Sequence, residues 1–146
     1  MTQTEFIQII SGFIGSLGFA VLFNIHGKRM LAAGFGGLLS WFLFVIFSYF
    51  TKNEPLNYFI VAMLITLYAE IMARVLKTPT TTFITTSLIP LIPGGSLYYT
   101  MAYAFKNDGE NFIIKGTYTL QLAAALALGI IVGTTLSKII FRKKIK

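Results

Sequence analysis

TFITTSLIPLIPGGSLYY, residues 82–99, is an apolar stretch with four helix-breaking residues inside six positions. Pro90 and Pro93 each lack an amide proton, and their rings crowd the preceding turn. Gly94 and Gly95 form the poorest helical dipeptide short of proline. Such a density of breakers predicts an unwound segment rather than a bend. The unwound segment is expected near the midpoint of the longer apolar segment 82–105.

Four other stretches are also long and apolar enough to cross a bilayer, which takes about 20 residues. The five predicted spans are residues 6–23, 30–50, 56–73, 82–105 and 116–137. Of the 146 residues 55% are hydrophobic and only 12% are charged, against about 25% charged in a typical soluble domain. We therefore predict an all-α integral membrane protein with five transmembrane helices, the fourth broken at midspan, in a single transmembrane domain over residues 1–146. The first span lacks a basic leader, which favours a retained helix over a signal peptide.

The composition also restricts the chemistry. The chain has no Cys and one His, His26, so thiolate sites and cysteine nucleophiles are excluded and a His-built zinc site is not expected. We predict no catalytic residues, metal or cofactor, and the chain is not predicted to be an enzyme. The net charge of +7 does not indicate a nucleic-acid partner, because the bases cluster at the ends of apolar segments.

The distribution of bases predicts the orientation in the membrane. Basic residues are enriched on the cytoplasmic side of membrane proteins. One side of the predicted topology receives nine bases and the other three. The nine are Lys28, Arg29, Arg74, Lys77, Lys138, Arg142, Lys143, Lys144 and Lys146, and the three are Lys52, Lys106 and Lys115. We therefore expect the amino terminus outside and the carboxyl terminus in the cytoplasm.

The broken fourth span is the candidate binding site. Backbone without internal hydrogen bonds is tolerated at membrane depth only when it is buried in protein or lines a wet cavity. A half-helix that begins near Gly94 would direct free N–H groups and a positive dipole end at the break. A small carboxylate is the predicted ligand. The predicted substrate-binding residues are Pro90, Pro93, Gly94, Gly95, Ser96 and Tyr99. The alternative is a proline-kinked helix that its neighbours stabilise.

Two further features are open to more than one interpretation. Glu70 has Arg74 at i+4, which is typical of an interfacial ion pair, although an intramembrane carboxylate is also a candidate for proton coupling. The hydroxyls before the break either bond to the preceding turn or line a pore; they belong to Thr81, Thr82, Thr85, Thr86 and Ser87.

Small residues recur at helical spacing in three of the predicted spans, which is typical of close helix packing. They are Gly12 and Ser16 in the first span, Ala32, Gly36 and Ser40 in the second, and Ala125, Gly129, Gly133 and Ser137, after Gln121, in the fifth. Several such faces on short helices predict that the chain docks on a partner or forms a homo-oligomer.

The segments EIMAR (70–74), KTP (77–79) and IPLIPGGSLYY (89–99) resemble the threonine/serine exporter family, as does GFAVLFN (18–24). The likeness is to the short form, which corresponds to the carboxyl-terminal half of the full-length exporter. The resemblance implies a five-helix half-transporter that works beside a separately encoded larger subunit in a bacterial inner membrane. It also implies substrates such as threonine, serine or succinate, export linked to the proton gradient, and a site at residues 90–99. Glu70 and Arg74 match the family pattern, which assigns them no role.

Together the residues and the resemblance predict a membrane transport subunit that exports a small carboxylate-bearing metabolite. The alternative is a structural subunit that only supports a transporting partner. An intramembrane enzyme ranks last, because it needs a nucleophile–base pair or metal ligands.

Overall fold

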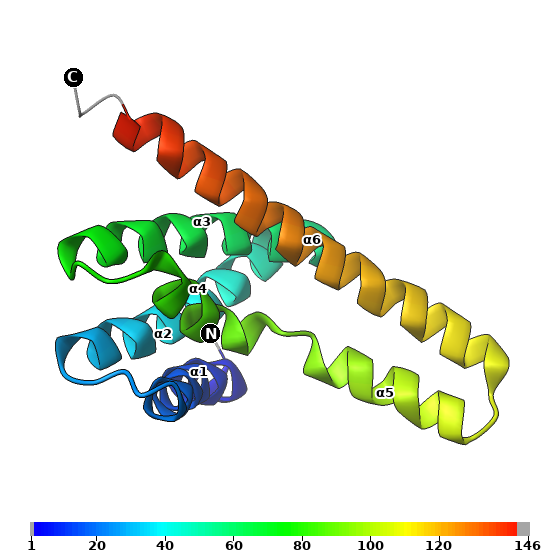
Figure 1. Ribbon diagram of the computed structural model, residues 1–146. Helices are drawn as coiled ribbons and strands as arrows, with labels where there is room; N and C mark the ends of the chain where they lie inside the picture. Colours follow the sequence, from blue (N-terminus) through cyan, green and yellow to red (C-terminus); the bar gives the residue numbers. More distant parts are fainter. Residues whose placement is uncertain (1, 143–146) are drawn as a thin grey trace.

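A computed structural model describes residues 2–142 of the chain, and the regular structure in that range is helical (Figure 1). The helices are α1 (Gln3–Leu22), α2 (Lys28–Phe50), α3 (Glu54–Val75), α4 (Thr80–Leu88), the 3-10 turn η1 (Ile89–Leu91), α5 (Gly94–Phe105) and α6 (Gly109–Arg142). The prediction of an all-α chain is confirmed.

Four of these helices, α1, α2, α3 and α6, are long and apolar enough to cross a membrane. The fourth predicted span corresponds to α4, η1 and α5, and neither α4 (9 residues) nor α5 (12 residues) could cross alone. Five membrane crossings therefore stay a prediction, whereas the interruption of the fourth segment is present in the structure.

α1 and α3 begin earlier than the predicted spans because polar residues cap them, whereas α2 and α4 begin earlier without a side-chain cap. Thr2 caps α1 in a capping box with Glu5, and Asn53 accepts the Leu56 N–H at the start of α3. The largest difference is at α6, which begins at Gly109 rather than Gly116. Capping side chains satisfy N–H groups that the first turn leaves without partners, so helices extend beyond their apolar portions.

The core has two parts. The first lies among α3, η1 and α6 and includes Val61, Ile65, Leu91 and Leu122, all at most 1% exposed. The second lies at the end that carries the α1–α2 and α3–α4 turns, where Ile25 packs with Ala73 and Phe83.

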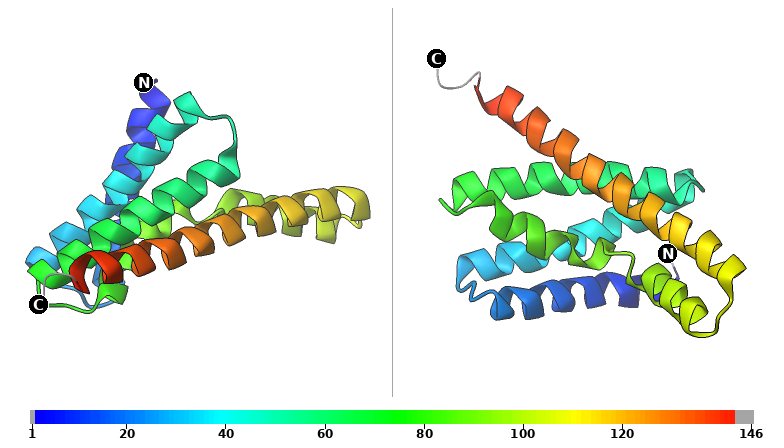
Figure 2. Two further views of the ribbon diagram at one scale, coloured as in Figure 1. Left: turned by 90° about the horizontal axis from the view of Figure 1, so that it is seen from above. Right: turned by 45° about the vertical axis from the view of Figure 1, so that its right-hand side comes forward.

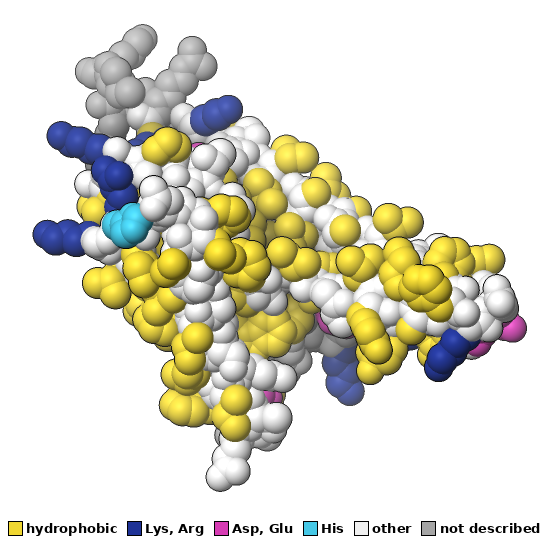
Figure 3. Space-filling model, turned by 60° about the horizontal axis from the view of Figure 1, so that its bottom comes forward, with side chains coloured by type: hydrophobic (Ala, Val, Ile, Leu, Met, Phe, Trp, Pro, Cys, Tyr) yellow, Lys and Arg dark blue, Asp and Glu magenta, His cyan; other side chains and the backbone are white. Residues whose placement is uncertain are grey.

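Figure 3 shows Lys and Arg side chains gathered around the His side chain at one end of the molecule. Of the nine bases counted for this side, Lys143, Lys144 and Lys146 lie outside the described residues, as does the side chain of Arg142.

Small residues let these helices approach closely, as their spacing predicts. A Cβ at Gly36 would lie 1.9 Å from the Ser87 hydroxyl of α4, and one at Gly37 would lie 1.9 Å from the Ser16 hydroxyl of α1. On α6, a Cβ at Gly129 would lie 2.5 Å from the Phe59 carbonyl of α3. These distances are far below ordinary contact, so the glycines are packing positions.

The segment α5 stands apart from the other helices. It forms a hairpin with the first half of α6 that projects away from α1–α4 (Figure 2). Among the elements of residues 2–142, only α6 has more than a marginal contact with α5. The α4–α5 interruption therefore lies where the chain leaves the bundle.

Candidate functional site

The interruption is a true break in the helix rather than a kink. α4 ends at Leu88, one 3-10 turn follows, and Ile92 is extended, with φ −63° and ψ 124°. Pro93 has φ −74° and ψ 56°, and α5 begins at Gly94. The breakers act locally as the sequence predicts, because neither proline can donate to a helical ladder.

Neighbouring helices hold the first side of the break. Leu91 is fully buried in the core. In a continuous helix the Thr86 carbonyl would accept the N–H of residue 90, which proline lacks. The Ser16 hydroxyl of α1 donates to this carbonyl instead, at 2.9 Å. On the α1 side of the break, the carbonyl that the proline leaves without a donor therefore has a hydrogen-bond partner within the protein.

The second side of the break is open. The Gly94 N–H donates to the Ile92 carbonyl at 2.6 Å, and the Leu97 N–H donates to the Pro93 carbonyl at 3.0 Å. Within residues 2–142 the amides of Gly95 and Ser96 have no acceptor. Gly94 and Gly95 are exposed, and a Cβ at either would meet no atom within 4 Å. Two N–H groups at a positive helix end can bind a carboxylate.

The Ser96 side chain points to α6 and takes part in a cluster of hydroxyls. Its oxygen lies 2.8 Å from the Thr119 hydroxyl, which lies 3.1 Å from the Thr100 hydroxyl. Thr100 also donates to the Ser96 carbonyl at 2.9 Å. The hydroxyl expected to help bind a ligand is therefore joined to the α5–α6 interface.

Tyr99, the aromatic residue of the candidate site, is 56% exposed, and its ring packs edge-on against Tyr98, with centroids 5.5 Å apart. It is exposed because α5 contacts α6 and not the rest of the bundle.

Pro90 faces away from α5, toward α1 and α2. With Ile89 it lines a hollow of about 290 Å³ whose other walls are Gln8, Ser11, Gly12, Gly15 and Trp41. Pro90 is thus separated from the open amides of α5 by the extended residues 92–93. The predicted site residues lie in sequence around the break, yet their side chains face three different surroundings.

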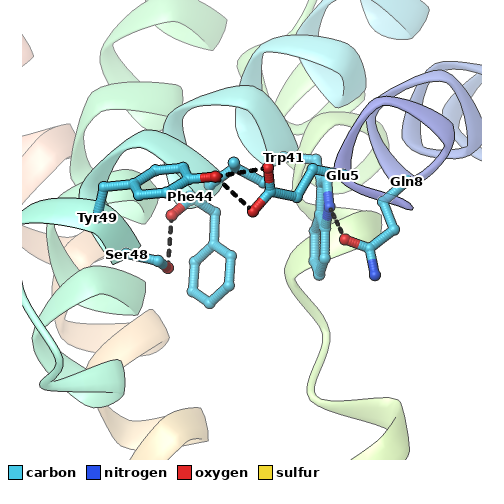
Figure 4. A pocket seen from close by; sticks show the side chains of 7 residues that line it. Glu5, Gln8, Trp41, Phe44, Ser48 and Tyr49 are labelled. Atoms are coloured by element: carbon cyan, nitrogen blue, oxygen red, sulfur yellow. Dashed lines mark hydrogen bonds between the residues drawn. The ribbon is translucent and has the colours of Figure 1, made fainter. Parts of the chain in front are cut away.

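A second hollow, of about 220 Å³, adjoins this one and shares Gln8 and Trp41 with it. The Tyr49 hydroxyl donates to the two Glu5 carboxylate oxygens at 2.8 and 2.7 Å, and the Trp41 indole N–H donates to the Gln8 side-chain oxygen at 3.3 Å (Figure 4). These residues were not predicted from the sequence. The available signal was Glu5 and Gln8, one turn apart at the start of an apolar helix.

Glu70 and Arg74 form an ion pair at 2.8 Å. Arg74 also donates to the Ser137 hydroxyl at 3.3 Å, and its guanidinium lies 3.9 Å from the centroid of the Phe141 ring. Thr119, which contacts Ser96, is 18 residues before Ser137 on α6, or about 27 Å along the helix axis. The structure does not bring the ion pair to the open end of α5.

Hydroxyls of α4 bond to the preceding turn, which is one of the two predicted alternatives. Thr85 and Thr86 donate to the carbonyls one turn back, at 2.7 and 2.9 Å. Thr81, Thr82 and Thr85 also line a small hollow of about 200 Å³. The buried Ser87 hydroxyl has no partner among the described residues.

Within residues 2–142 no group of three or more acidic or His side chains could hold a metal ion.

Comparison with known proteins gives one result. A family model described as threonine/serine exporter, ThrE, matches residues 8–136. No curated protein and no solved structure matches the chain. The matched range contains the break, the ion pair and most of both hollows.

Proposed function

The chain belongs to the threonine/serine exporter family, and from this premise we propose that it is a subunit of a transporter that exports small amino acids such as threonine and serine, or a dicarboxylate. Because the chain belongs to this family and has four helices long and apolar enough to cross a membrane, it is a multi-pass membrane protein of a transport family. The bacterial inner membrane, the amino terminus outside and the cytoplasmic carboxyl terminus are further parts of the proposal.

The proposed substrate site is the open end of α5. The observation that carries it is the pair of amides, Gly95 and Ser96, without an acceptor in the described chain. Their helix end is positive, and the two glycines place no side chain in front of it. In the proposed mechanism a substrate carboxylate accepts these N–H groups while two halves of the complex rock around it. Pro90 and Pro93 maintain the break, and Ser96 and Tyr99 flank the bound substrate.

The same geometry supports a partner. Interrupted backbone cannot face lipid without losing hydrogen bonds, yet Ile92, Gly94 and Gly95 are exposed in this chain. We propose that a larger subunit of the family covers α5 and completes the site. The exposed apolar side chains of α5, Leu97, Tyr98, Met101 and Phe105, suit such an interface. A homo-oligomer is the alternative, and the mass of the complex purified from native membranes separates the two.

A structural subunit is the second candidate function, because the exposed face of α5 would also suit a support for a transporting partner. The two functions differ in what binds substrate. If this chain takes part in transport, labelled threonine or succinate binds to the complex and the binding depends on Gly94. A purely structural subunit leaves substrate binding insensitive to changes at the break.

The site is tested with the double variant Pro93→Ala/Gly94→Leu. A Cβ at residue 94 would meet no atom of the described chain within 4 Å, so we expect the leucine side chain to cover the amides without disturbing the fold. We expect export to be abolished and membrane insertion to be unchanged, measured as counterflow of labelled threonine, serine and succinate in vesicles that contain the complex. Gly18→Leu is the matched control, since Gly18 is equally open. Normal counterflow by the double variant refutes the site.

Glu70 and Arg74 are proposed as the proton-coupling pair. The Glu70 carboxylate is largely buried, with a side-chain exposure of 12%. Coupling to the break could act along α6 or through α3, whose Ile65 packs with Leu91 of η1. Glu70→Gln is expected to leave substrate binding intact and to remove the dependence of export on the proton gradient. An unchanged pH dependence dismisses this role.

The orientation can be tested cleanly because the chain has no Cys. Single cysteines are introduced at Arg29, between the first two predicted spans, and at Lys106, between the last two, which the predicted topology places on opposite sides of the membrane. A membrane-impermeant thiol reagent added to whole cells is expected to label the cysteine at position 106 and not the one at position 29. The reverse pattern would invert the proposed topology.

A further inference from the structure

The two adjoining hollows between α1 and α2 form a groove with a charged end and an apolar end. At the charged end lie Glu5, Ser48 and Tyr49, and at the apolar end lie Gly12, Ile89 and Pro90. Gln8 and Trp41 line both hollows. Because Ile89 and Pro90 belong to η1, the groove reaches the side of the break that α1 and α2 hold.

The charged end is chemically specific. Glu5 is half-buried and forms no ion pair with a Lys or Arg among residues 2–142, where the only such pair is Glu70–Arg74. The Glu5 carboxylate accepts the Tyr49 hydroxyl and the Thr2 N–H. An ionised carboxylate has about four acceptor positions, so capacity for at least one more donor remains. A carboxylate with spare acceptors and no Lys or Arg partner within residues 2–142 suits a cationic ligand.

The walls of this end favour a small ammonium group. The rings of Trp41 and Phe44 lie with centroids 5.2 Å apart, and Tyr49 supplies a third ring. Aromatic faces attract ammonium ions through their quadrupoles. The Ser48 hydroxyl donates its proton to the Phe44 carbonyl at 2.8 Å, which leaves its oxygen able to accept. Carboxylate, hydroxyl and rings together match the three donors and positive charge of a primary ammonium.

We propose that this groove binds the ammonium group of an amino-acid substrate, with Glu5 as the charge partner and Trp41, Phe44 and Tyr49 as the surrounding rings. This inference rests on the proposed transport function and adds to it a second recognition site, separate from the carboxylate site at the end of α5. The groove then selects threonine or serine over a dicarboxylate. Succinate has no ammonium group, and its carboxylates are repelled by Glu5.

A purely structural role for Glu5 predicts something different. Glu5 also belongs to the capping box of α1, and glutamine serves that motif as well as glutamate does. Glu5→Gln therefore keeps the cap and removes the charge. A loss of ligand binding in this variant cannot be attributed to a lost cap, and its far-ultraviolet circular dichroism is expected to match the parent.

Trp41 provides the measurement, because it is the only tryptophan in the chain and it lines both hollows. The chain is reconstituted in lipid nanodiscs and titrated with four ligands while tryptophan emission is recorded. Threonine and threonine methyl ester, which retain the ammonium, are expected to give a saturable change. N-acetylthreonine and succinate, which lack it, are expected to give none.

The variants complete the test. Glu5→Gln is expected to weaken the threonine response by about tenfold or more, as for a lost charged hydrogen bond. Glu110→Gln, at the exposed first turn of α6, is the matched control and leaves the response unchanged. The inference is overturned if threonine gives no saturable response, if succinate or N-acetylthreonine responds like threonine, or if Glu5→Gln behaves as the parent. The proposed function is judged separately, by counterflow in the Gly94 variant.

Discussion

The hydroxyl of Ser16 donates a hydrogen bond of 2.9 Å to the carbonyl of Thr86, which is the carbonyl that Pro90 leaves without a donor. Both residues are fully buried, and Ser16 lies directly against Gly37 of α2. A polar group on α1 thus replaces the backbone bond that the proline removes from α4. This contact fixes where the fourth segment breaks relative to the bundle.

Ser16→Ala is expected to lower the free energy of unfolding by about 1–3 kcal/mol, because it leaves a buried carbonyl without a donor. The measurement is a denaturant titration in detergent micelles. Ser48→Ala is the control: the Ser48 hydroxyl only bonds to its own helix, at the Phe44 carbonyl, so little change is expected there.

Pro90→Ala sharpens this prediction through a double-mutant cycle. With alanine at residue 90 an N–H becomes available to the Thr86 carbonyl. Ser16→Ala should then cost less than in the parent, with a coupling energy of about 1 kcal/mol. Additive losses would show that the Ser16 hydroxyl does not replace the bond that Pro90 removes.

Gly37→Ala is expected to destabilise the α1–α2 interface by about 1–3 kcal/mol, as overpacked substitutions do. The new Cβ would lie 1.9 Å from the Ser16 hydroxyl and 2.8 Å from the Gly12 carbonyl. Rotation of Ser16 relieves only the first of these contacts. Gly18→Ala is the matched control, because a Cβ there meets no atom within 4 Å and alanine favours the helix. Equal stability of the two variants in thermal unfolding would contradict the packing interpretation.

The features predicted from the sequence are those that depend on short-range properties. Pro90, Pro93 and the two glycines break the helix because of their own covalent structure, so the break was predictable without knowledge of the neighbours. The small-residue stripes were predictable for a related reason, since close helix approach needs the absence of side chains. Glycine at helical spacing carries that information in the sequence itself.

The groove could not be predicted because its contacts depend on how α1 and α2 pack. Trp41 and Gln8 are 33 residues apart, and Tyr49 and Glu5 are 44 apart. No periodicity within one span reveals which polar residue of another span it meets. The exposure of Tyr99 in the described chain could not be predicted for the same reason: it depends on the direction in which α5 leaves the bundle, and not on the depth of Tyr99 in the apolar segment.

The start of α6 is expected to weaken at low pH through Asp108. The Asp108 carboxylate accepts the side-chain amide of Asn111 at 2.8 Å and its backbone N–H at 3.2 Å, and these hydrogen bonds lower the pKa of Asp108 below its ordinary value of 3.8. A folded-state pKa below the unfolded one stabilises the folded form above the unfolded value, and the contribution is lost as the pH falls through the folded one. Hydrogen-exchange protection of residues 109–113, relative to the unfolded chain, should therefore fall as the pH drops below the ordinary Asp108 pKa of 3.8.

Asp108→Ala separates this cap from other acid effects. The variant should show low protection of residues 109–113 at neutral pH and little further change on acidification. Protection that still falls with pH in the variant would assign the effect to another carboxylate, such as Glu110 in the same turn.

Arg74→Lys is expected to loosen the contact between α3 and α6 without affecting substrate binding. Arg74 reaches Glu70 and Ser137 together while its plane lies over the Phe141 ring, and a lysine ammonium lacks the planar group that stacks and donates in this way. Since the Arg74 side chain is 41% exposed, the expected loss is only about 0.5–1 kcal/mol of unfolding free energy. Arg29→Lys, in the exposed first turn of α2, is the control. Threonine affinity should stay constant in both variants because the cluster is about 27 Å along α6 from the Ser96 contact; a parallel loss of affinity and stability in Arg74→Lys would instead link this end of α6 to the break.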